Sequence, residues 1–139
     1  MDTITIFAAG DSRGNPGPAA IGVRILDARN EVLAEVSESI GNATNNFAEY
    51  YAVMRGLQTV EEILGDNTQK VKLEVKLSNE IVKLQLNGEH QIKEPGLVPY
   101  FIEIYNMRVS SFPNITFTHI SRALNEEAQG LLLKVLGSA

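Results

Sequence analysis

The sequence predicts an α/β fold in which a mixed five-stranded sheet, three antiparallel strands and then two parallel ones, is flanked by helices. Three observations support this. The chain opens with three apolar or alternating segments joined by short turns, the apolar period then lengthens from two to three or four residues, and strands and helices alternate from there on. Such alternation needs crossover connections and therefore parallel pairing. With 139 residues, 44% of them hydrophobic, we expect one domain spanning residues 1–139.

The first three strands follow from apolar residues near the amino terminus. Residues 3–8 alternate apolar and polar, residues 21–26 form an apolar run, and residues 32–36 alternate again. The short connection 27–30 has the length and composition of a hairpin turn. We therefore expect these strands to be antiparallel neighbours.

A long amphipathic helix follows. From Asn45 onward apolar residues recur at steps of three and four as far as Leu64, and Gly65 stands where such a helix would end. Either Thr44 or Asn45 supplies the side chain that caps its start.

The rest of the chain alternates strand and helix. Apolar spacing and breakers predict these segments: a strand at 70–76, a helix at 79–86 ended by Asn87-Gly88, a loop at 95–99, a helix at 100–109, a strand at 115–120 and a helix at 125–136.

Composition limits the function classes. There are no cysteines, so disulfides and thiolate metal sites are excluded, and the amino terminus has neither a basic start nor a long apolar run. We expect a cytoplasmic protein without a membrane span. The net charge of -5 argues against strong nonspecific binding to nucleic acid, which draws on Lys and Arg.

Four segments, in order, carry a family resemblance: the loop 11–18 (DSRGNPGP) after the first strand, 43–50 (ATNNFAEY), 78–89 (SNEIVKLQLNGE) and 119–129 (HISRALNEEAQ). In their order and spacing they resemble type 1 ribonuclease H. The segment after Gly88 lacks a long basic insertion, which is similar to the short, handle-free branch of that family.

The resemblance implies a catalytic site that is degenerate here. The family holds two divalent ions with four acids, which activate water for phosphodiester hydrolysis. The matching positions in this chain are Ala9, Glu49, Ser78 and Gln129, so Glu49 is the sole retained acid. We therefore expect no metal cofactor.

Neighbouring acids offer few substitutes. Asp11 lies about 6.6 Å along the strand from Ala9 if the strand reaches it. Glu80 and Glu127 are each two helical positions from a matched site, a turn of about 200° that directs them away. Glu126 is only about 60° from the face of Gln129. The alternative function is therefore a weak or atypical magnesium-dependent hybrid ribonuclease, with at most one weakly bound ion at Glu49 and Glu126.

The residues that grip nucleic acid in the family are retained. The matches are the amides of Asn15, Asn45 and Asn46, the phosphate-accepting hydroxyl of Thr44, and Arg122 and Asn125 before the last helix. Neutral amides suit the wide minor groove and 2′-hydroxyls of an A-like duplex. The resemblance thus implies a non-cleaving binder of RNA/DNA hybrid or another duplex.

Two interpretations without nucleic-acid binding stay open. The turn and cap sequences around Asn15 and Thr44 could persist only for folding. The chain could also be a protein-interaction module on an inactive nuclease scaffold, with residues 97–101, Ile102, Ile104 and Met107 as an apolar patch if they are exposed. The sequence leaves the oligomeric state open.

Overall fold

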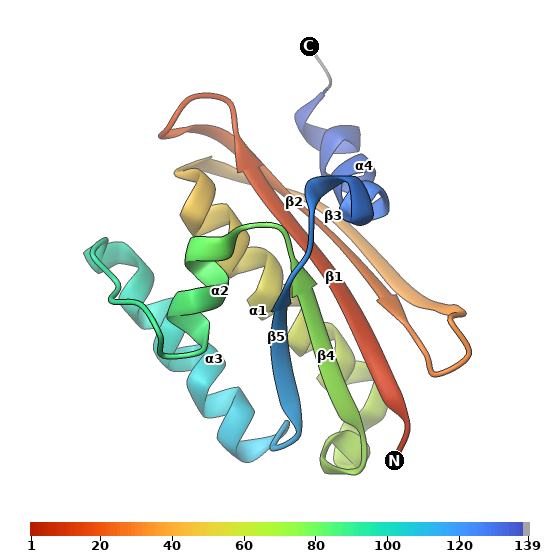
Figure 1. Ribbon diagram of the computed structural model, residues 1–139. Helices are drawn as coiled ribbons and strands as arrows, with labels where there is room; N and C mark the ends of the chain where they lie inside the picture. Colours follow the sequence, from red (N-terminus) through yellow and green to blue (C-terminus); the bar gives the residue numbers. More distant parts are fainter. Residues whose placement is uncertain (138–139) are drawn as a thin grey trace.

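The computed structural model describes residues 1–137 and confirms the predicted α/β architecture (Figure 1). Its five strands are β1 (Thr3–Ser12), β2 (Gly17–Leu26), β3 (Val32–Ala43), β4 (Lys72–Leu77) and β5 (Ile115–His119). They lie in the order β3-β2-β1-β4-β5. The first three are antiparallel neighbours, whereas β1 pairs with β4, and β4 with β5, in parallel.

Four α-helices connect and flank the strands. They are α1 (Asn45–Leu64), α2 (Glu80–Leu86), α3 (Val98–Ser110) and α4 (Glu126–Leu136), with short 3-10 turns η1 (Gly65–Lys70), η2 (Pro95–Leu97) and η3 (Arg122–Asn125). Thr44 is the N-cap of α1, as one of the two predicted alternatives. Gly65 ends that helix at a φ of 56°, a left-handed conformation that glycine adopts without steric cost.

Several boundaries differ from the prediction, and β3 in particular runs to Ala43 instead of ending at residue 36. β1 continues to Ser12 and β2 starts at Gly17, because Asp11 pairs with Ala20 and Ser12 with Ala19 across the ladder. The predicted turn is therefore confined to residues 13–16. The loop predicted for 95–99 was wrong in its second half, since α3 already begins at Val98; a proline fits the first turn of a helix, where no backbone donor is needed.

The two faces of the sheet carry different helices. On β1, Ile6 and Ala8 belong to the main core with α1, whereas Phe7 and Ala9 point to the opposite face and pack against the region of α4. Successive side chains on a strand alternate between faces, so neighbouring residues of β1 serve different helices. Figure 1 shows α1 behind the sheet and α4 in front of it.

A glycine brings each of these helices close to the sheet. A Cβ at Gly10 of β1 would overlap the backbone of Ala48 in α1, and a Cβ at Gly22 of β2 would overlap the backbone of Ala128 in α4. Both strands therefore need glycine for close helix approach. Because Gly22 pairs with Ala9, which adjoins Gly10, the two approaches lie at the same end of the sheet.

None of the helices in residues 1–137 combines the length and apolar character that a membrane crossing requires.

Candidate functional site

The candidate site lies where β1 outruns β4. The last residue of β4, Leu77, pairs with Ala8, and β1 continues to Ser12 without it. Two side chains serve the backbone there: Asn125 Nδ2 donates to the Ala8 carbonyl at 2.9 Å, and Glu49 Oε1 accepts from the Gly10 N–H at 3.0 Å. These two side chains bond to β1 where β4 ends, so the hydrogen bonds anchor both side chains in the fold.

Glu49 is a buried carboxyl group, only 4% exposed. Its second oxygen, Oε2, has no hydrogen-bond partner among the described residues. Burial raises the pKa of Glu49 to about 8; the Gly10 hydrogen bond opposes this rise, nearby Asp11 adds to it, and Arg122 opposes it. At neutral pH this carboxyl is therefore mostly protonated and uncharged.

The other matched positions are dispersed around the end of the sheet. Ala9 is fully buried in an apolar cluster with Ala20, Ala128 and Leu132. Gln129 has a buried side-chain oxygen without a partner among residues 1–137. Ser78 is half-buried between β4 and α2. Glu49 thus belongs to the α1 side, and Ala9 faces the α4 side.

A groove and a second hollow lie beside each other at this end. The groove encloses about 370 Å³ and is lined by Gly10, Asp11, Asn45, Glu49, Ser78, Asn79, Glu80, Ile81 and Arg122. The second hollow, of about 420 Å³, contains Glu126 and Gln129. Arg122 borders both. Glu49 and Glu126 therefore line different hollows, with the Arg122 side chain at their boundary.

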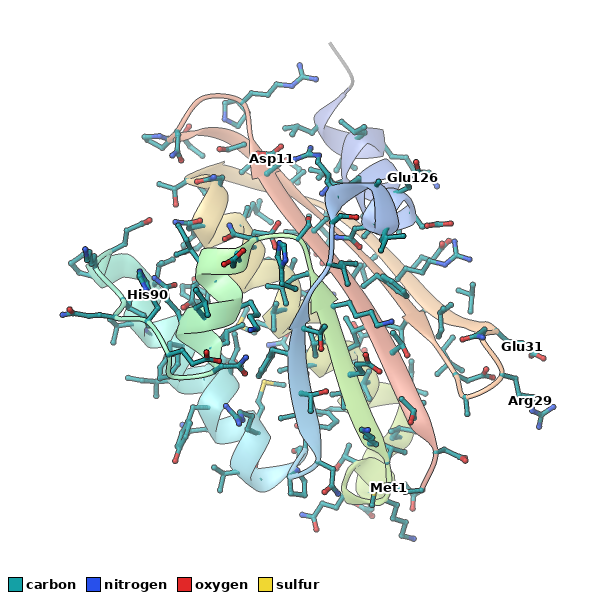
Figure 2. The ribbon with its side chains drawn as sticks, in the orientation of Figure 1. Met1, Asp11, Arg29, Glu31, His90 and Glu126 are labelled. Atoms are coloured by element: carbon teal, nitrogen blue, oxygen red, sulfur yellow. The ribbon has the colours of Figure 1, made fainter. Side chains whose placement is uncertain are left out.

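Asp11 and Arg122 face each other at this boundary. Asp11 Oδ2 lies 3.5 Å from Arg122 Nη2, and both side chains are exposed enough for solvent to weaken the pair. Figure 2 shows Asp11 near the same end of the sheet as Glu126. The expectation that Glu80 turns away is corrected, because α2 starts at the rim of the groove and Glu80 lines it. Within residues 1–137 no group of three or more His, Cys, Asp or Glu is placed to hold a metal ion.

The start of α1 forms a polar wall. Thr44 Oγ1 accepts from the Phe47 N–H at 3.1 Å and satisfies one of the free donors of the first helical turn. Asn15 Oδ1 accepts from the Asn45 N–H at 3.0 Å, which ties the first loop to the helix. The Asn45 side chain lines the groove. Thr44, Asn15 and Asn45 therefore lie together at the start of α1.

Asn46 joins two helices instead of facing the groove freely. Its Oδ1 accepts from Asn79 Nδ2 at 2.9 Å, and its Nδ2 donates to Glu94 Oε1 at 3.0 Å. Asn79 Oδ1 in turn accepts from the Val82 N–H at 3.1 Å and caps α2. Neither Asn79 nor Glu94 was predicted from the sequence as part of the site. An asparagine directly before a helical pattern was a signal for the cap, but nothing local indicated Glu94.

Asn125 occupies a different place from the one expected. It is fully buried, and its amide is committed to the Ala8 carbonyl. A side chain without exposed surface cannot touch a ligand, so Asn125 positions β1 and the start of α4. Arg122, three residues earlier, has a side chain that is 69% exposed.

Similarity to known families and solved structures shows which family this chain belongs to. A family described as Reverse transcriptase-like matches residues 8–132, nearly the whole chain. LC11-RNase H1, isolated from compost, is 39% identical, with a TM-score of 0.90 over 96% of this chain and 95% of that one. The chain belongs to the ribonuclease H-like family.

Further relatives fit this membership. Ribonuclease HI of Halobacterium salinarum is 33% identical over 94% of this chain and 62% of its own length. A bifunctional protein of Mycobacterium tuberculosis is 35% identical over 98% of this chain and 36% of its own length. The chain thus spans less than two thirds of these two relatives. LC11-RNase H1 has also been solved in complex with an RNA/DNA hybrid, with 39% identity, a TM-score of 0.89 and 94% coverage of each chain.

The apolar patch expected for protein interaction is partly internal. Leu97 and Ile104 are 1% exposed and Met107 is 8% exposed, because they pack into the main core. Val98 and Ile102 remain at the surface, 40% and 51% exposed. The expected patch is therefore reduced to its exposed members.

Proposed function

We propose that this ribonuclease H-like protein binds RNA/DNA hybrid or another duplex without cutting it. The observation that carries the proposal is the contrast at the end of β1. The position matched to a metal-binding acid, Ala9, is packed in an apolar cluster, while an open groove beside it is lined by Asn45 and Asn79.

The donors at the four matched positions do not fit a pair of ions, and within residues 1–137 the groove carboxylates of Asp11, Glu49 and Glu80 do not form a group placed to hold one. Catalytic ion pairs lie about 3.5–4 Å apart and are held by several oxygen ligands. Ala9 has no donor atom, the Glu49 carboxyl is buried and bound to Gly10, and the Gln129 amide lines the other hollow. A metal-dependent cleavage step therefore has no support in these residues.

Loss of charge favours binding in the absence of metal. A carboxylate about 4 Å from a phosphate opposes it by about 4 kcal/mol at an effective dielectric constant of 20. With Ala9, Ser78 and Gln129 at three of the four matched positions, this repulsion is reduced. Amide groups can then contact the sugar edge of an A-like duplex. The hybrid complex of LC11-RNase H1 shows that a similar scaffold accommodates such a ligand.

Binding of a fluorescent RNA/DNA hybrid in EDTA tests the proposal. We expect saturable binding that added Mg²⁺ does not strengthen, and intact RNA after prolonged incubation with Mg²⁺ or Mn²⁺. A dissociation constant above about 1 mM, which corresponds to a binding free energy of about −4.1 kcal/mol, rejects hybrid binding.

The Glu49→Gln variant separates this proposal from the alternative of weak hydrolysis. Cleavage that depends on Mn²⁺ and disappears in the variant establishes a catalytic Glu49. Two well-occupied anomalous manganese peaks beside Glu49 would overturn the non-cleaving assignment as well.

A further inference from the structure

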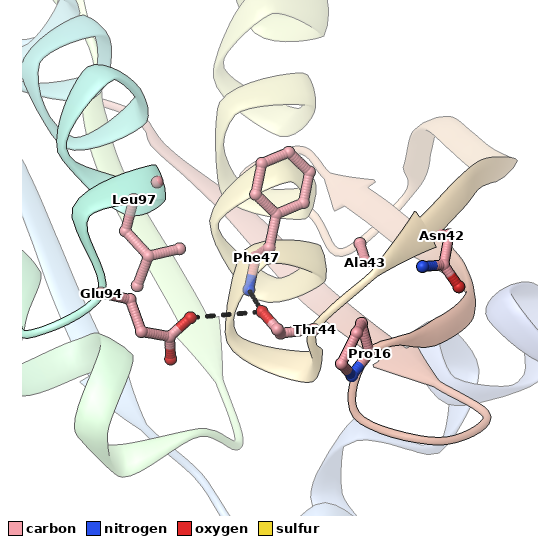
Figure 3. A pocket seen from close by; sticks show the side chains of 8 residues that line it. Pro16, Asn42, Ala43, Thr44, Phe47, Glu94 and Leu97 are labelled. Carbon is pink, nitrogen blue, oxygen red and sulfur yellow. Dashed lines mark hydrogen bonds between the residues drawn. The ribbon is translucent and has the colours of Figure 1, made fainter.

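A carboxylate of this chain already sits at the start of α1. Glu94 Oε1 accepts from Asn46 Nδ2 at 3.0 Å, and Glu94 Oε2 lies 3.4 Å from Thr44 Oγ1 (Figure 3). Thr44 and Asn46 are 50 and 48 residues away from Glu94 in the sequence. The contact is therefore a product of the tertiary fold.

The partners of Glu94 are groups that suit an anion. Within residues 1–137, no basic side chain forms an ion pair with Glu94. Its carboxylate instead contacts a hydroxyl and an amide, and both stand at the amino end of a helix of 20 residues, where the helix dipole favours negative charge. This contact shows that the Thr44 hydroxyl and the Asn46 amide can donate to an anionic oxygen.

Glu94 also stands between two hollows. One, of about 230 Å³, is lined by Pro16, Asn42, Ala43, Thr44, Phe47, Glu94, Gly96 and Leu97. The other, of about 260 Å³, contains Asn46, Ile81 and Glu94, and Ile81 also lines the groove at Glu49. The hollows thus follow one another past the start of α1, and Glu94 divides them.

We propose that Glu94 is an internal competitor for phosphate at the start of α1, so that a nucleic-acid backbone must displace its carboxylate to reach Thr44 and Asn46. The inference rests on the proposed binding function for its biological meaning. The ligand class is a phosphate group, either a phosphodiester of the duplex or a free phosphate. Glu94 lowers the affinity of this end of the groove and disfavours ligands that cannot supply an anion.

The Glu94→Gln variant tests the inference, because it removes the charge and keeps an oxygen that can accept from Asn46. Glu89→Gln is the matched control: it removes the same charge from an exposed residue of the same connection between α2 and α3. Each variant and the parent protein are titrated with inorganic phosphate and, separately, with the hybrid. Backbone amide shifts of residues 44–47 report where the phosphate binds, and circular dichroism checks folding.

We expect Glu94→Gln to bind both ligands about fivefold to tenfold more tightly than the parent, with shifts at residues 44–47, and Glu89→Gln to change affinity by less than about twofold. Equal effects of the two variants, or phosphate shifts located elsewhere, overturn the inference. If phosphate behaves as expected but no variant binds hybrid, the proposed function fails while the phosphate competition by Glu94 stands. If the parent binds hybrid and Glu94→Gln binds neither ligand more tightly, only the inference fails.

Discussion

The two helices that meet the sheet at the end of β1 build opposite kinds of surface. The α1 wall, formed by Thr44, Asn45, Asn46 and Asn79, is a network of neutral hydrogen-bonding groups at the edge of the groove. The α4 wall, formed by Ala9, Ala20, Ala128, Leu132 and Gln129, is mostly apolar and closely packed. Both helices approach the sheet over a glycine, so the difference lies in the side chains rather than in the backbone.

Under the proposed function, this difference separates two properties of the site: contacts to a duplex are kept on the α1 wall, and metal ligands are missing on the α4 wall. The family resemblance implies metal acids on the first strand, the long helix, the end of the fourth strand and the last helix. Under the proposed function, Ala9 and Gln129 on the α4 wall supply no acidic ligand, and the small apolar residues pack together there. The α1 wall depends on helix caps and amide contacts that also hold the fold, so it can persist without the metal chemistry.

The largest expected effect comes from disrupting the α4 wall at Gly22. The Gly22→Ala variant places a methyl group against the backbone of Ala128 and Leu132, which cannot move without shifting α4. We expect the free energy of unfolding to fall by about 3 kcal/mol or more, measured by urea denaturation. Gly130→Ala is the control, because a Cβ there meets open space. Equal stability of the two variants would show that α4 is not packed closely against β2.

On the α1 side, the Glu49 carboxyl has a smaller effect on stability, and this effect depends on pH. Its pKa is raised from 4.5 to about 8 in the folded protein, so the folded state binds more protons than the unfolded state between these values. The stabilising contribution is complete below the unfolded pKa and is lost as pH rises through the folded pKa. We expect the parent to lose about 2 to 3 kcal/mol more stability than Glu49→Gln between pH 5 and 8. Parallel pH profiles of denaturation for the two proteins would contradict the raised pKa.

The smallest expected effect concerns recognition of the hybrid by the α1 wall. The Asn45 side chain lines the groove, and its Oδ1 accepts from the Asn46 N–H at 2.9 Å, which leaves the amide NH₂ as a donor toward a ligand. We expect Asn45→Ala to weaken hybrid binding by about fivefold to twentyfold and to lower stability by less than about 1 kcal/mol. Asn106→Ala, at an exposed position on α3, is the control for fluorescence titration. Unchanged binding in Asn45→Ala removes the α1 wall from the recognition surface.

Local pattern explains much of the fold. The alternation at Ile4, Ile6 and Ala8 predicted β1, and the apolar steps from Asn45 to Leu64 predicted α1, because each element needs one continuous buried face. The end of β1 escaped prediction, since Asp11 and Ser12 have turn-forming character and become strand only by pairing with Ala20 and Ala19. Tertiary pairing overrode local preference there.

The sequence also placed some residues of the candidate site correctly and others wrongly. Motif order located Glu49, Thr44, Asn45 and Asn46, and these residues do lie at one end of the sheet. It also placed Asn125 at a ligand surface, where the structure buries it against Ala8. Burial depends on which segments pack above a residue, and a motif carries no information about that.

By itself the sequence determined the family, the order of the elements and the residue types at Ala9, Ser78 and Gln129, because periodicity and residue identity are written along the chain. Only the tertiary structure decided that Glu49 is buried and nearly neutral and that Glu94 reaches the start of α1. Those properties arise from contacts between residues distant along the chain, whose desolvation and hydrogen bonding exist only after the sheet and helices have assembled.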